Sequence, residues 1–476
     1  MNIFRMAWEG IKGMFGFGSK EITQALRLPE SIVSSDMQNA MQKWLSMYQN
    51  KSPWLEDGTV FSLNLGKFVV AELSRLTTIE MEIKFADENG KENKRTAWFT
   101  LVLERSLPYL PQKLELGQAV GGLVIKPYVR NKALYWDFVL QSDLVVLAFN
   151  DDGQMSHVVF KDTHKENKSY YTRFEQHEMA PEGVWVRNYA FKSSTEGALG
   201  QQCPLTEVQK WEMLVPEVLV KDWHSPLFGY YRVPLANAIS IDSPLGVSVF
   251  SGADTLIADA DRQYSRLLWE YEAGEMAIDV DPAALKPKTE TRNGKKVEAM
   301  PTLNKRLFRA VDVGADKLYE AYNPDLRDAS FSAGLNKILM KIEDQCGLAR
   351  GTISDPNNEV RTATELKILR QRTDSTITSN QAALEDCLRQ VFNVMDLYAT
   401  NYDIVGQGTW EAAFQWDDSI VTDSQQQLQE RFALEAIGAM SRAEVRAWYT
   451  GETLEAAELA VKDIQSSRPS LASLLE

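Results

Sequence analysis

The sequence has little cysteine, no long apolar run and few histidines. Its three cysteines are widely spaced and odd in number, at Cys203, Cys346 and Cys387. A disulfide framework needs paired cysteines, so this pattern is typical of a chain that folds in a reducing cytoplasm. No window approaches the roughly 18 uninterrupted apolar residues of a transmembrane helix, so no contact with a membrane is predicted. Residues 1–19 are partly apolar, but charged residues interrupt them and no small-residue cleavage site follows, which indicates an amphipathic segment and not a signal peptide.

Sequence motifs for catalysis are missing as well. The four histidines form no HExxH motif and no other close metal-ligand spacing (His157, His164, His177 and His224). The sequence contains neither a P-loop motif nor a GxSxG elbow. The net charge of −15 excludes a general nucleic-acid binder, because phosphate neutralisation needs a basic surface. We therefore predict no enzyme, no cofactor and no metal site, and an acidic protein that could surround DNA without gripping it.

What is present indicates a folded α+β protein. Hydrophobic residues make up 44% and aromatic residues 10% of the 476 positions, which is typical of a folded chain with two to four subdomains. Helical periodicity predicts helices over 31–48, 66–77, 96–107 and 113–119. The period then changes to two, which predicts an antiparallel meander of short strands over 123–129, 134–139, 144–149, 155–161, 169–177 and 184–191. Residues 204–244 have the pattern of a loop.

The second half begins with a helix that is followed by a basic unit. A capping box of Ser251 and Asp254 predicts a helix to about residue 271. A compact, turn-rich unit over 280–313 follows, with a local charge of +6 between residues 286 and 309. Two interpretations stay open, a solvated hairpin tip and a subdomain inserted between two helices. The basic residues of this patch are Lys286, Lys288, Arg292, Lys295, Lys296, Lys305, Arg306 and Arg309.

A helix–loop–helix segment over 322–398 organises the rest of the chain. An apolar stripe predicts a first helix that ends at Gly347, and turn-forming residues occupy 350–361. A capping box of Thr362 and Glu365 predicts a second helix without Pro or Gly as far as 398. Its middle, 370–380, has Ile377 as its only large apolar residue. Four interpretations of this polar stretch stay open. It belongs to an ordinary scaffold helix, it bridges solvent, it lies against polar surfaces of a neighbour, or it marks a kink in the helix.

The C-terminal part is predicted to hold one strand over 409–416 and a small helical cluster. A first helix is expected over 425–437 and ends at Gly438. A second helix begins at a cap formed by Ser441 and Glu444, and a third runs over 454–464.

Several segments, in order along nearly the whole chain, resemble the portal proteins of tailed bacteriophages, specifically the siphophage type common in phages of Gram-positive hosts. These segments are MQKWLSMYQNKSPWL (41–55), GQAVGGLVIKPYV (117–129), YYTRFEQH (170–177), PLGVSVFSGA (244–253), YNPDLR (322–327), CGLARGTIS (346–354) and TATE (362–365). The resemblance implies a ring of about twelve copies at one capsid vertex, with a central tunnel for DNA. It also implies the order of parts in the chain. We expect an α+β wing (1–250), a first stem helix (251–274), a clip (275–324), a second stem helix (325–347), a tunnel loop (348–361), a long helix with the return strand of the wing (362–422) and a helical crown (423–476).

The resemblance also implies partners and contact residues. We expect DNA contacts from the tunnel loop, at Arg350, Asn357, Asn358 and Arg361, and we expect the basic patch of the clip to face the terminase, the head-completion adaptor or DNA. The implied partners are further copies of the chain, double-stranded DNA read without sequence specificity, the terminase large subunit, the major capsid and scaffolding proteins and the adaptor. The implied location is the virion, after assembly in the host cytoplasm. The alternatives are another virion component, such as an adaptor or minor head protein, and an intracellular enzyme without a visible motif.

Overall fold

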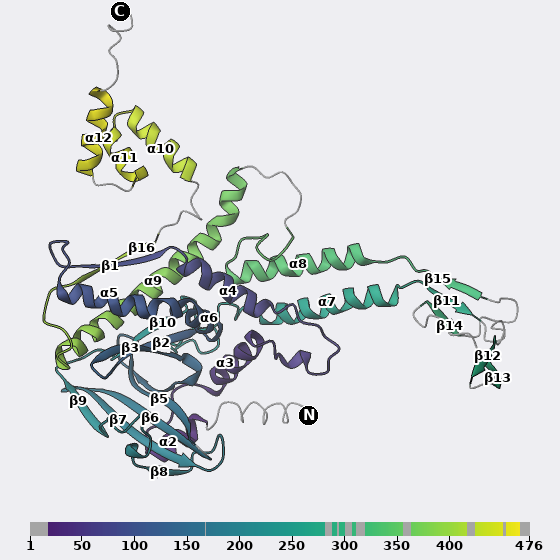
Figure 1. The fold of residues 1–476 in the computed structure, drawn as a ribbon, viewed down its shortest axis with the longest axis horizontal. Coiled ribbons are helices and arrows are strands. Elements are labelled where there is room, and N and C mark those ends of the chain that lie inside the picture. The colour runs from purple at the N-terminus through teal and green to yellow at the C-terminus, as the bar shows by residue number, and fades with distance from the viewer. Residues whose placement is uncertain are drawn as a thin grey trace, which may run out of the picture. The chain divides into compact units, whose positions relative to one another are not determined.

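A computed structural model describes residues 18–166, 168–280, 288–292, 295–299, 307–310, 319–355, 363–416, 424–450 and 454–466. The chain divides into two compact units. The first comprises Met1–Ile79 and Ile83–Phe414, and the second Glu80–Glu82 and Gln415–Glu476. Figure 1 shows the elements of each unit along the chain.

Helices dominate the start of the first unit, and polar side chains fix where they begin. The hydroxyl of Ser34 accepts a hydrogen bond from the Met37 amide (3.2 Å), so the helix predicted from residue 31 begins later. Asn93 and Thr96 form a reciprocal capping box at the start of α5. The five helices here are α2 (Ser19–Leu26), α3 (Ser35–Tyr48), α4 (Leu65–Thr78), α5 (Lys94–Ser106) and α6 (Leu110–Val120). The sequence predicted α3 to α6 and missed α2.

The strands lie where the sequence predicted them, but they do not form one meander. β2 (Gly122–Arg130) and β3 (Ala133–Leu140) join β10 (Gly229–Arg232) in a three-stranded sheet of order β10-β2-β3. A second, six-stranded sheet has the order β4-β5-β6-β7-β8, with β9 also paired to β7. The strands β9 and β10 lie in the segment predicted to be a loop (204–244), and β8 lies just before it. The bounds in the second sheet are β4 (Val145–Phe149), β5 (Met155–Glu166), β6 (Ser169–Ala180), β7 (Gly183–Ser193), β8 (Gln201–Cys203) and β9 (Glu217–Lys221).

An aromatic cluster joins distant parts of the first unit. β1 (Met81–Ala86) pairs with β16 (Glu411–Trp416), and α9 (Ala363–Asn401) carries Phe392 into the same cluster. The ring centroids of Phe85 and Phe392 are 4.9 Å apart, and those of Phe99 and Trp410 4.7 Å apart. Burial of rings of this size makes a large contribution to core stability. Phe85 and Phe99, far from α9 in the sequence, thereby hold this long helix in place through Phe392.

Two helices and a small β unit project from this core. α7 (Asp254–Ala273) and α8 (Asp328–Cys346) lie side by side (Figure 1). Between them β11 (Ala277–Val280) pairs with β14 (Phe308–Ala310) and β15 (Tyr319–Tyr322), and β12 (Lys288–Arg292) pairs with β13 (Lys295–Ala299). The capping box predicted at the start of α7 is wrong. Ala253 occupies the N-cap without a side-chain bond, because Asp254 is already helical and its carboxylate accepts from Lys43 (2.5 Å).

The described part of the second unit holds α10 (Ser424–Ala436), α11 (Arg442–Thr450) and α12 (Leu454–Ser466). The predicted cap is confirmed: the Ser441 hydroxyl accepts from the Glu444 amide (3.1 Å), and the Glu444 carboxylate accepts from the Ser441 amide (2.7 Å). Gly438 has a φ of 75°, as expected of a glycine that follows a helix end.

Candidate functional site

The candidate site is the junction between α8 and α9, where the sequence placed a DNA-facing loop. Hydrogen bonds join the start of α8, at the far end from this junction, to the end of α7. The Glu270 carboxylate accepts three hydrogen bonds from Arg327, from the backbone amide (3.0 Å), Nε (3.0 Å) and Nη2 (2.6 Å). The Arg327 guanidinium also lies 5.4 Å from the centre of the Phe331 ring. These contacts fix the start of α8 against the end of α7.

At its other end α8 stops at Gly347, as the sequence predicted. This residue has a φ of 70°, and a Cβ there would come within 3.3 Å of the Thr376 Cβ on α9. Glycine therefore both permits the left-handed turn and lets α9 approach. Just after the turn, the Ala349 amide donates to the Thr373 hydroxyl (2.6 Å). The loop is thus tied to both helices where it begins.

A fully buried carboxylate organises the next part of the loop. Glu343 Oε1 accepts hydrogen bonds from the backbone amides of Gly351 (3.1 Å), Ile353 (2.6 Å) and Ser354 (2.9 Å). Its Oε2 accepts from the Ser354 hydroxyl (2.7 Å). Hydrogen bonds to an ionised acceptor are stronger than neutral ones. The segment from Gly351 to Ser354 is therefore a preformed turn around one carboxylate.

Basic side chains cluster on the exposed side of this turn. Asp344 accepts two hydrogen bonds from Arg350 (3.1 and 2.8 Å), and Arg372 on α9 lies 3.2 Å from the same carboxylate. Lys341 is 4.0 Å away. The hydrogen bond from Arg350 is the main reason that the pKa of Asp344 lies below its usual value. Three exposed cations thus lie within 4.0 Å of the Asp344 carboxylate. We call Lys341, Arg350 and Arg372 the junction cations.

The polar middle of α9 is explained in part by contacts inside the chain. α9 runs unbroken for 39 residues, about 58 Å at 1.5 Å per residue. Within 370–380, Ile377 and Asn380 are buried, and the Asn380 side chain accepts from the Tyr231 hydroxyl (2.5 Å). Thr373 and Arg372 contact the junction, as described above. The segment therefore packs in part against polar groups of its own subunit, which among the interpretations of the sequence is nearest to an ordinary scaffold helix.

The structure brings only part of the predicted DNA-contact set together. Arg350 is exposed but paired with Asp344. Asn357, Asn358 and Arg361 lie outside the described residues. The described loop ends at Asp355, whose amide donates to the side chain of Asn336 on α8 (2.7 Å). Arg372 was missed because nothing in the helical pattern of α9 marks which polar residue faces α8.

The predicted basic patch is divided between two β elements. Lys288 and Arg292 lie on β12 and Lys295 and Lys296 on β13, with Arg292 opposite Lys295 in the antiparallel register. On β14, Arg309 pairs with Asp279 through two bonds (2.7 and 3.0 Å) and lies 5.0 Å from the centre of the Tyr322 ring. Its charge is thereby compensated. The other three residues of the patch, Lys286, Lys305 and Arg306, lie outside the described residues.

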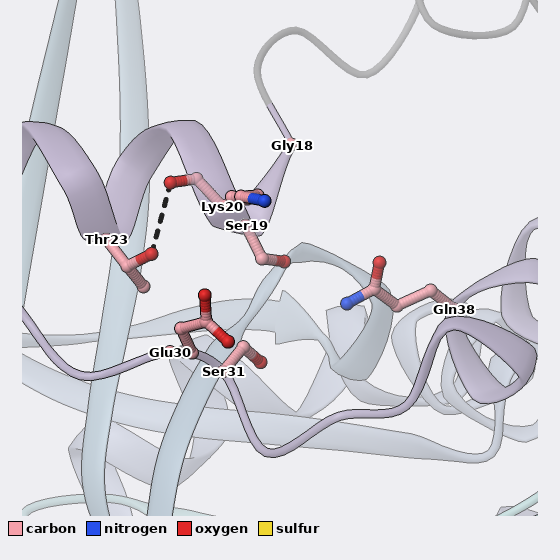
Figure 2. Close-up of a pocket in the computed structure, with 7 residues that line it drawn as sticks. All are labelled: Gly18, Ser19, Lys20, Thr23, Glu30, Ser31 and Gln38. Atoms are coloured by element: carbon pink, nitrogen blue, oxygen red, sulfur yellow. Dashed lines mark hydrogen bonds between the residues drawn. The ribbon is translucent and has the colours of Figure 1, made fainter.

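Other features of the described part offer no chemistry of their own. A cavity of about 260 Å³ lies at the start of α2, with polar side chains from α2 and from residues 30–38 around it; the hydrogen bond drawn there joins the Thr23 hydroxyl to the Lys20 carbonyl (3.1 Å) (Figure 2). Among the described residues no group of three His, Cys, Asp or Glu side chains could hold a metal ion. Within the same ranges, no helix combines the length and apolar character needed to cross a membrane.

Comparison with known families gives one result. Residues 80–468 match the family described as phage portal protein, SPP1 Gp6-like, which is a structural, non-enzymatic family. No curated protein matches the chain. The match confirms the resemblance given by the sequence segments, and the mixture of helices and sheets agrees with the predicted α+β portal fold.

Proposed function

The chain belongs to the family of SPP1 Gp6-like phage portal proteins, whose members form a ring at the capsid vertex, and from that premise we propose that its α8–α9 junction contacts the DNA that passes through the ring. The observation that carries this proposal is the preformed turn around Glu343 with the three junction cations beside it. The stem helices are then α7 and α8, the clip is the β unit between them, and the crown is α10 to α12.

The charge at the junction suits a conduit. Phosphate neutralisation by many cations gives tight, salt-dependent binding, which would hinder the movement of DNA. Here Asp344 competes with phosphate for Arg350 and Arg372. With a net charge of −15 on each chain, contacts with DNA would be few and short-lived. Asn357, Asn358 and Arg361 stay part of the proposed loop on the sequence alone.

Removal of the junction cations tests this proposal. The variant with Lys341→Gln, Arg350→Gln and Arg372→Gln removes the charges and leaves Asp344 in place. We expect rings of normal size and heads that package or retain at least tenfold less DNA. The control carries three other exposed lysines changed to glutamine (Lys51, Lys67 and Lys91). Normal packaging by the junction variant would refute the assignment of this site, whereas a similar loss in the control would show a general charge effect.

The β12–β13 hairpin is proposed as the docking site for the terminase large subunit during packaging and for the head-completion adaptor afterwards. Its support is the basic register of Lys288, Arg292, Lys295 and Lys296 on one small hairpin. Changing these four residues to glutamine should weaken capture of purified terminase by the portal ring, without loss of the ring. Unchanged capture would place the docking site elsewhere.

The position of the protein in the head separates a portal from other virion components. We expect assembly with the major capsid and scaffolding proteins to place a labelled chain at one vertex of each head. A label distributed over all vertices would identify a minor head protein, and a label at one vertex that is added only after DNA packaging would identify an adaptor.

A further inference from the structure

A group of charged side chains lies between the two larger sheets and takes no part in the site described above. At its centre, the Glu175 carboxylate meets three basic side chains. Its Oε2 atom lies 2.8 Å from Nζ of Lys126 and 3.0 Å from Nη2 of Arg173, and its Oε1 atom lies 2.8 Å from Nε2 of His177. Lys126 comes from β2 in the three-stranded sheet, and the other three residues come from β6 in the six-stranded sheet. We call these four residues the inter-sheet cluster.

The surroundings of His177 are apolar. The residue is 4% exposed, and the centre of its ring lies 5.1 Å from that of Phe160 and 6.1 Å from that of Phe228. Its neighbours in the register of the sheet are Val158 on β5 and Val186 on β7. A charged group in such a place costs free energy, because the charge loses its hydration. The pocket therefore favours a neutral imidazole.

The long helix α9 packs against the same face of the six-stranded sheet. Val394 on α9 is buried against Val184 and Leu227, and Tyr398 packs on that cluster. Burial raises the pKa of Tyr398, and the negative charge of Glu175 raises it further, so these two side chains lie near each other. The inter-sheet cluster therefore lies where β2, β6 and α9 meet.

A further proton on His177 would have to go to Nδ1. An ionised carboxylate accepts hydrogen bonds and does not donate them, so Nε2 carries the proton that is shared with Glu175. Nδ1 is buried and has no hydrogen-bond partner within the described part of the chain. A proton there would place an unpaired donor in an apolar pocket and a third positive charge beside Lys126 and Arg173. Burial lowers the pKa of His177 and both cations lower it further, whereas the hydrogen bond to Glu175 raises it.

The other acidic residues around the cluster do not offset that charge. Asp162 on β5 lies 3.8 Å from Arg173 and 2.9 Å from Lys210. Asp137, opposite Lys126 in the register of β2 and β3, is exposed to solvent. Among the described residues, an added proton on the ring would therefore meet no second carboxylate.

We propose that the inter-sheet cluster is an acid-sensitive latch, in which a proton added to Nδ1 of His177 loosens the packing of β6 against β2 and α9. The proton makes a buried cluster more positive, and the repulsion is relieved when the imidazolium or Lys126 reaches water. Because Lys126 is the member from the other sheet, the movement that relieves the repulsion separates the two sheets. The latch lies within the first unit and does not depend on the proposed contact with DNA.

The sign and size of the effect follow from the ordinary pKa of histidine. In the open form His177 titrates near pH 6.5, so it is about 90% protonated at pH 5.5. Opening then takes up a proton that the closed form lacks, so the closed form keeps its stability above about pH 6.5 and loses it as the pH falls below that value. Opening should therefore become up to about tenfold more frequent between pH 7.5 and pH 5.5.

Hydrogen exchange of the full-length protein at pH 7.5 and 5.5, corrected for the intrinsic pH dependence of exchange, measures this opening. In peptides that cover residues 169–180 and 391–398 we expect protection to fall by about three- to tenfold at the lower pH. His177→Gln can still donate to Glu175 but cannot titrate, so its protection should stay within about twofold. The control His224→Gln removes an exposed histidine and should show the same fall as the wild type.

Titration of the individual histidines, followed by mass spectrometry through exchange of their C2 hydrogens, tests the latch without any substitution. We expect the ring of His177 to titrate at a lower pH than the ring of the exposed His224. A His177 that titrates together with His224 would overturn the latch, and so would an equal fall in protection for His177→Gln and the wild type. If His177→Gln does not fold, Lys126→Met takes its place: the loss of one cation should raise the pH at which His177 titrates, and an unchanged value would refute the role of the charge.

Discussion

The order of the junction turn depends on one buried carboxylate, and Glu343→Ala tests this dependence. The substitution removes the acceptor of the Ile353 and Ser354 amides, whereas the Gly351 amide keeps the Ser354 hydroxyl at 3.1 Å. A buried amide without a partner costs about 1–3 kcal/mol, so two of them cost about 4 kcal/mol. Because each 1.4 kcal/mol is about a tenfold change, the protection factors of these amides should fall at least a hundredfold. The isosteric Glu343→Gln keeps an acceptor oxygen for the backbone amides but loses the charge and replaces Oε2, the acceptor of the Ser354 hydroxyl, by an amino group, which together cost about 1–2 kcal/mol and about tenfold in protection.

Hydrogen exchange followed by mass spectrometry measures this in a peptide that covers residues 348–355. The matched control is Glu272→Ala, which removes an exposed glutamate from α7. We expect the order wild type and control, then Glu343→Gln, then Glu343→Ala. Protection in Glu343→Ala within threefold of the wild type would refute the role of the carboxylate, since no other described group accepts from the Ile353 amide. A loss that extends over the whole of α8 would instead show that Glu343 supports the helix.

Three further outcomes follow from buried groups. Burial raises the pKa of Glu175, but the charges of Lys126 and Arg173 and the hydrogen bond with His177 outweigh this effect, so the pKa lies well below its usual value. The stabilisation that this carboxylate gives above about pH 4 is therefore lost in acid. Glu175→Gln should cost about 3–5 kcal/mol at pH 7 and flatten the acid dependence, and an unchanged urea midpoint would contradict this. Burial raises the pKa of Cys346 to about 12, so only Cys203 should react with a thiol reagent in the native protein, and labelling of Cys346 without unfolding would show that α8 opens. Gly229→Ala places a Cβ against the Cys387 carbonyl oxygen and 2.7 Å from the Val391 side chain, and it should destabilise the protein by about 3 kcal/mol in a urea titration. The control Gly406→Ala, where a Cβ meets nothing within 4 Å, should leave the midpoint unchanged.

Periodicity predicted most elements to within a few residues. The bounds of β2 to β7, α8 and α9 follow the apolar spacing closely, because that spacing is imposed by which face each element buries. Period two does not say which strands pair. The division into two sheets depends on the chain between β3 and β4, where the buried Gln141 side chain donates to the Gly246 carbonyl (2.9 Å), a contact across 105 residues. No local pattern contains that information.

The candidate site was predictable to a different degree. Gly347 was visible from turn chemistry, and Arg350 was named because the resemblance implied a DNA-facing loop there. Glu343 was not selected, because a glutamate beside an apolar stripe has the pattern of an ordinary exposed helix residue. Its role arises only when the chain turns back over it, since its partners are backbone amides that every sequence has. Arg372 was missed for a related reason, as its pairing with Asp344 joins two helices.

The described cations at these surfaces share one property that composition alone does not show. Arg350 and Arg372 contact Asp344, and Arg309 contacts Asp279. Each carboxylate must be displaced, or its attraction overcome, before a phosphate gains the full charge of its partner. Surface ion pairs of this kind are worth at most about 1 kcal/mol, so the displacement is easy and reversible. Under the proposed function, an acidic ring with paired cations would offer DNA many weak contacts of similar energy, so that a duplex could move along the wall without a strongly preferred stop.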